Sequence, residues 1–220
     1  MDSITPTSTP QRKSIDTGAL KKFAQEARRV LRDQVSTKLA QVLAENSAAR
    51  REAPKAVQEL AGEIGRTSRD QVIERVAYTW FNRFTALRFM DANSYTAVRV
   101  VTPADGQTRP EILSEAMAGI IGDEVPESVA AQVRALLDNR TPSRDPQGEA
   151  YRLLVVATCN HWHAVMPFMF ETIADYTELL MPEDLLSQGS ILARLRTVMT
   201  EDACQDVEII GWLYQFYISE

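Results

Sequence analysis

The segment from Val72 to Met90 constrains the fold most strongly, because apolar side chains recur there at every third or fourth position. This spacing is that of one face of an α-helix. Trp80, Phe81 and Phe84 belong to the stripe, and aromatic rings bury a large apolar area when they are packed inside a protein. The segment therefore predicts a central helix in a mainly helical core.

Helices are predicted on both sides of this segment. An apolar stripe runs from Leu20 to Leu43, with Asp16 or Thr17 as N-cap, and an alanine-rich helix near Pro54 is expected to end before Gly65. Thr67 or Ser68 is placed to cap the central helix, and Asn93 to end it. Further helices are expected at 110–120, 127–138, 146–166, 188–199 and 202–218.

One segment, Tyr95 to Val101, is β-branched and alternating, and this pattern predicts a strand. The expected fold class is therefore mainly α, an irregular multi-helix domain with at most one short strand or hairpin. Residues 1–17 are rich in Ser, Thr and Pro and almost free of apolar side chains, which predicts a disordered tail. One domain is expected over residues 18–220.

The composition indicates a reducing compartment and a cytoplasmic location. Two cysteines form no disulfide framework, the N-terminus lacks the apolar core of a signal peptide, and no apolar run is long enough to span a membrane. The sequence also lacks Gly-x-Gly fingerprints, a Walker loop and a Gly-x-Ser-x-Gly elbow. We therefore predict no catalytic and no cofactor-binding residue.

Cys159, His161 and His163 form the cluster that most resembles a metal site. On a helix, Cys159 and His163 share a face while His161 points nearly the opposite way. Two ligands are fewer than the four of a closed zinc site, so no metal is predicted.

Charge is distributed unevenly along the chain. Residues 1–100 hold 17 Lys and Arg against 11 Asp and Glu, a balance of +6, whereas residues 101–220 hold 7 against 19, a balance of −12. The basic half is either a surface for a polyanion or a well-solvated face of one domain, and both interpretations stay open here. The candidate DNA-binding residues are Arg28, Arg29, Arg32, Arg69, Arg75, Arg83 and Arg88.

The last stretch, ACQDVEIIGWLYQFYISE, stays apolar almost to its final residue, whereas domain ends usually fray into polar residues. We therefore expect the sequence to continue into a longer protein. Four aromatic residues form a candidate docking face there, and we expect the isolated chain to self-associate through it. They are Trp212, Tyr214, Phe216 and Tyr217.

Five stretches together resemble one family, the PglX adenine-specific DNA methyltransferases of BREX phage-defence systems. They are LKKFAQEARRVL, VIERVAYTWFNRFTALRFMD, SRDPQGEAYRLLVVATCN, YTELLMPEDLL and the C-terminal stretch from Ala203. The likeness runs from about Gly18 to Glu220 and is to the N-terminal region of the family. It implies a parent enzyme that methylates adenine N6 in host DNA with S-adenosylmethionine.

The resemblance carries over no catalytic residue. The family's [Asn/Asp]-Pro-Pro-aromatic loop is absent, since none of the five asparagines precedes proline and Asp145-Pro146 is followed by Gln147. The chain is thus expected to be a non-catalytic helical N-terminal domain that helps to position DNA or to dock subunits. Its implied partners are the catalytic domain of the same enzyme, other BREX subunits and DNA. The alternative is a self-standing helical protein-interaction module without DNA contact.

Overall fold

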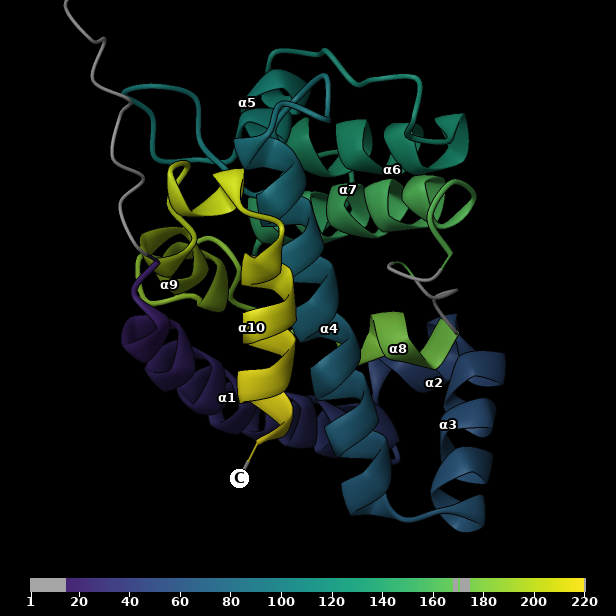
Figure 1. Cartoon of the computed structure of the whole chain (residues 1–220). Coiled ribbons are helices and arrows are strands. Elements are labelled where there is room, and N and C mark those ends of the chain that lie inside the picture. The colour runs from purple at the N-terminus through teal and green to yellow at the C-terminus, as the bar shows by residue number, and fades with distance from the viewer. Residues whose placement is uncertain (1–14, 168–169, 171–174, 220) are drawn as a thin grey trace, which may run out of the picture.

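A computed structural model describes residues 15–167, 170 and 175–219, and these form a mainly helical domain (Figure 1). The α-helices are α1 (Thr17–Leu43), α2 (Ala48–Glu52), α3 (Pro54–Arg66), α4 (Arg69–Ala92), α5 (Glu111–Met117), α6 (Glu127–Leu137), α7 (Pro146–His163), α8 (Asp175–Leu179), α9 (Ile191–Val198) and α10 (Glu208–Ile218), with a 3-10 turn η1 (Ala203–Gln205). Within this described part the only β pairing is an isolated bridge between Pro103 and Pro110. The predicted mainly α class is confirmed.

Helix α4 is the centre of the core, as its aromatic stripe predicts. Trp80, Phe81 and Phe84 are at most 2% exposed. The indole Nε1 of Trp80 donates a hydrogen bond to the carbonyl of Thr177 at 3.0 Å, so the polar atom of this ring is satisfied. Helices α1 and α10 pack against α4 and against each other, and Figure 1 shows α10 lying along α4 while α1 crosses behind both.

The predicted helix boundaries are confirmed where capping side chains set them. Asp16 accepts the backbone N–H of Ala19 at the start of α1, and Ser68 accepts that of Gln71 at the start of α4. The end of α4 at Asn93 is also as predicted. The predicted stop at Gly65 is wrong, because α3 continues to Arg66 and glycine keeps a helical backbone there.

The predicted strand over Tyr95–Val101 is also wrong, because side chains rather than a neighbouring strand satisfy its backbone. The buried carboxylate of Asp91, at the end of α4, accepts backbone N–H groups at 2.8–2.9 Å from Val100, Val101 and Thr102. The buried hydroxyl of Tyr151 donates to the carbonyl of Val100 at 3.0 Å. The segment is therefore an ordered, irregular connection.

The remaining helices are shorter than predicted. Helix α7 ends at His163 rather than at residue 166, and a bend at Asp206 separates η1 from α10 in the region predicted as one helix. Helix α8 was not predicted, because it is a single short turn. The predicted disordered tail lies almost entirely outside the described residues. No helix in the described part of the chain is long and apolar enough to cross a membrane.

Two groups of helices frame the surfaces considered below. Helices α5, α6 and α7 stack against one another, at the top of Figure 1. Helices α2, α3 and α8 form a second group at the lower right of that view, joined to α1.

Candidate nucleic-acid and protein interfaces

The three predicted arginines of α1 lie on one side of the helix, next to α4. Arg28 donates to Glu74 of α4 at 2.9 Å, and Arg32 lies 3.2 Å from the other oxygen of the same carboxylate. Arg29 is exposed and forms no ion pair with another described residue. These arginines line a shallow hollow of about 420 Å³ together with Gln25 and Asp33. Three guanidinium groups against the two carboxylates of Glu74 and Asp33 leave this surface with a formal charge of +1.

The predicted arginines in the first half of α4 differ in their surroundings. Arg75 donates to the largely buried Glu63 of α3 at 2.7 Å and to the hydroxyl of Tyr176 at 2.9 Å. The hydrogen bond from Arg75 lowers the pKa of Glu63, with burial opposing the shift and Arg66 adding to it. Arg69 is exposed at the start of α4. Arg75 thus joins α3, α4 and α8, and Arg69 stays available to a ligand.

Arg83 and Arg88 are core residues, which removes them from any DNA surface of this fold. They are only 1% and 5% exposed. The guanidinium carbon of Arg83 lies 5.0 Å from the ring centroid of Trp80, a cation–π contact. Arg88 donates to the carbonyl of Met199 at 2.8 Å and to the hydroxyl of Thr102 at 2.9 Å. Their helical spacing misled the sequence prediction, since a buried arginine and an exposed one produce the same pattern.

Three of the four predicted docking aromatics are accessible on α10. Trp212 and Tyr214 are 36% and 47% exposed, and Phe216 is half-buried. The Trp212 and Phe216 rings are stacked with centroids 5.7 Å apart.

Tyr217 is the exception, because it lies fully buried against Phe81 of α4 with ring centroids 4.3 Å apart. Tyr78, also on α4, contacts both Tyr214 and Tyr217. Tyr217 therefore anchors α10 to the core. The other three residues flank this buried stripe, with Trp212 and Phe216 stacked on one side and Tyr214 beside Tyr78 on the other, and together they are called the outer surface of α10.

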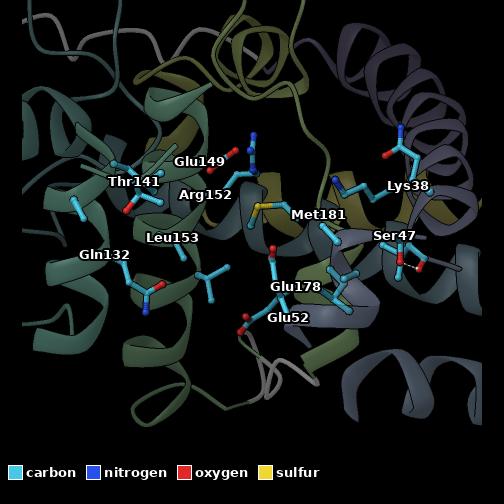
Figure 2. Close-up of a pocket in the computed structure, with 18 of the residues that line it drawn as sticks. Lys38, Ser47, Glu52, Gln132, Thr141, Glu149, Arg152, Leu153, Glu178 and Met181 are labelled. Atoms are coloured by element: carbon cyan, nitrogen blue, oxygen red, sulfur yellow. Dashed lines mark hydrogen bonds between the residues drawn. The ribbon is translucent and has the colours of Figure 1, made fainter. Parts of the chain in front are cut away.

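A larger concavity, which the sequence did not predict, opens between α1, α2, α6, α7 and α8. This interhelical groove has a volume of about 940 Å³ (Figure 2). Val42, Leu153, Val156, Leu179 and Met181 supply apolar surface to it. The alanine spacing on α6, with Ala131 and Ala135 four residues apart, was the available sequence signal.

The cysteine and histidine cluster is divided between the core and the surface. Cys159 is buried, and burial raises its pKa to about 12. His163 Nδ1 is in hydrogen-bonding contact with the carbonyl of Phe170. No group of three His, Cys, Asp or Glu side chains in the described residues is arranged to hold a metal ion.

Comparison with known proteins identifies two relatives of this chain. No family model matches it. It is 37% identical over 151 residues to the adenine-specific methyltransferase BrxX of Escherichia coli O9:H4 (strain HS), covering 68% of this chain and 12% of that protein. It is 34% identical over 157 residues to the adenine-specific methyltransferase PglX of Lacticaseibacillus casei (strain Zhang), covering 68% of this chain and 13% of that protein. The chain spans about one eighth of the length of these relatives. The predicted resemblance is thereby confirmed, and this chain is a relative, over that stretch, of the BrxX and PglX adenine-specific methyltransferases.

Proposed function

We propose that the chain is the non-catalytic, helical N-terminal domain of an N6-adenine-specific DNA methyltransferase of a BREX phage-defence system, acting in the cytoplasm. Its task is to dock the catalytic part of the same enzyme. The observation that carries the proposal is the outer surface of α10, where aromatic side chains are exposed. The parent enzyme would use S-adenosylmethionine, held by residues outside this chain.

The composition of α10 supports docking. Residues 209–218 include no charged side chain, although one face of the helix is open to solvent. Ile209, Leu213 and Tyr217, spaced four residues apart, bury the inner face. Trp212 and Tyr214 stand on the outer surface with Ile218, which is 52% exposed. Aromatic-rich and charge-depleted surfaces of this kind are typical of the centre of protein interfaces.

The length of the relatives supports the catalytic part of the same enzyme as the partner. Each is about eight times as long as the part that this chain matches, so most of such a methyltransferase lies in other regions. A contact with another region of the same enzyme would cover the aromatic surface permanently. Other BREX subunits are the further class of partner that the proposal allows.

The experiment is a binding measurement between this chain and the separately produced catalytic part of its methyltransferase, by sedimentation velocity. We expect a one-to-one complex that the double variant Trp212→Ser, Tyr214→Ser weakens by at least about tenfold. The matched control is Met117→Ser, Ile120→Ser, which removes two exposed apolar side chains at the end of α5 and directly after it, outside α10, and should leave binding unchanged. Self-association through α10 without a mixed complex would contradict the proposal.

DNA positioning is the second candidate function, and the positive surface on α1 and the start of α4 favours it. Arg29 and Arg69 are exposed, and Arg28 with Arg32 carry more charge than Glu74 neutralises. Fluorescence anisotropy of a labelled duplex at several salt concentrations tests it. Affinity that falls steeply with salt and drops in Arg29→Ala, Arg69→Ala would support phosphate contacts. No binding at low salt would leave a protein-interaction module without DNA contact.

A further inference from the structure

We propose that the interhelical groove is a second docking site, which binds a short amphipathic helix carrying basic residues. The groove separates the α5–α7 group from α1, α2 and α8, and it is distinct from the outer surface of α10. The inference is therefore independent of the proposed function. Three properties of the groove support it, namely an apolar floor, an acidic rim and a suitable size.

The floor is apolar and the walls are made from small side chains. Leu153 and Val156 of α7, Val42 of α1 and Met181 all line the groove. Four alanines line the walls, and their short side chains leave room for the backbone and side chains of an additional helix. They are Ala48 and Ala49 on α2 and Ala131 and Ala135 on α6.

The rim carries acidic side chains from both walls. Glu52 comes from α2 and Glu149 from α7, and neither forms an ion pair within the described part of the chain. The nearby cations are already engaged. Lys38 pairs with the carboxylate of Glu183, and Arg152 lies 3.8 Å from the carboxylate of Asp145 and donates to the carbonyl of Glu183 at 2.7 Å.

The hydrogen bond from Lys38 lowers the pKa of Glu183, which keeps this ion pair charged. The rim that remains is negative, and Figure 2 shows its charged residues distributed around the groove. A partner with Lys or Arg beside its apolar face complements this arrangement better than an acidic or neutral one.

The size of the groove matches a helical segment. Two turns of α-helix are roughly 10 Å long and 10 Å across, a cylinder of about 800 Å³. The groove holds about 940 Å³. Helix-in-groove recognition uses apolar anchors at i, i+3, i+4 and i+7, and these would lie on Leu153 and Val156.

The test uses fluorescein-labelled synthetic peptides of roughly 18 residues, long enough to form a helix. One peptide has leucines at i, i+3, i+4 and i+7 with lysines elsewhere. The second has glutamates in place of the lysines, and the third has the residues of the first in scrambled order. Fluorescence anisotropy with the full chain should show binding of the first peptide at least about tenfold tighter than of either control.

Variants of the chain locate the binding. Ala131→Trp fills the groove from an exposed position on α6 and should reduce affinity at least about tenfold. The matched control Ala61→Trp places the same side chain on the exposed face of α3, outside the groove, and should bind as the unmodified chain does.

Two charge variants test the rim. Glu52→Gln and Glu149→Gln should each weaken binding about two- to fivefold, and Glu59→Gln on α3 should not. Failure of the first peptide to bind, equal binding of the acidic or scrambled peptide, or an Ala131→Trp variant with full affinity would each overturn the proposal.

Discussion

Helices α4 and α10 are both rich in aromatic residues, yet they distribute polar and apolar side chains in opposite ways. Helix α4 buries the charged groups of Arg83, Arg88 and Asp91 at 5% exposure or less. Helix α10 exposes Trp212 and Tyr214, although it has no charged residue between positions 209 and 218.

The difference shows that neighbours rather than composition decide burial in this domain. Helix α4 is covered by α1, α9, α10 and the connection that follows it, so its charged side chains are enclosed, and those of Arg88 and Asp91 are hydrogen-bonded there. Helix α10 packs against α1 and α4, and its buried residues are Ile209, Leu213 and Tyr217. A buried charge with its hydrogen bonds intact specifies one arrangement of the chain, whereas an exposed aromatic surface is suited to a partner.

The largest expected effect concerns the buried charges of α4. Asp91→Ala removes the acceptor of three backbone N–H groups and should lower the free energy of unfolding by about 3 to 5 kcal/mol, measured by urea denaturation. Asp91→Asn keeps the shape and one carbonyl acceptor, so its loss should be smaller. A loss below about 1 kcal/mol for Asp91→Ala would show that the connection is held by its apolar contacts instead.

The second prediction compares the stability effects of removing two buried tyrosine hydroxyls, that of Tyr151 in the core near α4 and that of Tyr217, which anchors α10. Tyr151→Phe leaves the carbonyl of Val100 without its donor and should cost about 1 to 2 kcal/mol of unfolding free energy. Tyr217→Phe removes a buried hydroxyl that has no hydrogen-bond partner within the described residues, so stability should stay the same or rise by up to about 1 kcal/mol. Equal losses in the two variants, measured by thermal and urea unfolding, would contradict this contrast.

The outer surface of α10 gives a smaller expected effect on stability. Trp212 is 36% exposed and stacks on Phe216, so Trp212→Gln should cost about 0.5 to 1 kcal/mol. The same variant should reduce the self-association that we expect of the isolated chain, measured by light scattering across a concentration series. A monodisperse monomer before and after the substitution would remove that expectation, while a large loss of stability would place Trp212 in the core.

Sequence periodicity predicted the parts of the fold that depend on local pattern. The apolar stripe of α4, the cap of α1 at Asp16 and the cap of α4 at Ser68 each depend on residues of a single helix and its first turn. All three are confirmed. The wrong strand prediction for Tyr95–Val101 shows where periodicity stops being informative. The backbone of that segment is hydrogen-bonded to Asp91, which lies outside the alternating pattern.

The candidate surfaces were predicted less completely for the same reason. The burial of Arg83, Arg88 and Tyr217 is set by helices distant in sequence, and periodicity cannot distinguish it from exposure. The interhelical groove is formed by five helices, so no single segment carries its pattern.

The smallest expected effect concerns the ion pair between Arg75 in the first half of α4 and Glu63 of α3, in which the arginine is partly exposed and the carboxylate is largely buried. The pKa of Glu63 is lowered, first by the hydrogen bond from Arg75, relative to an unfolded value of 4.5. The ionised form is therefore favoured in the folded state, and its stabilising contribution is present above pH 4.5 and is lost as the pH falls through the lower, folded value. Glu63→Gln should remove this part of the acid sensitivity, which unfolding experiments at a series of pH values below neutrality measure. Glu59→Gln on the same helix is the matched control, and an identical acid profile for both variants would show that the pair with Arg75 contributes nothing to stability.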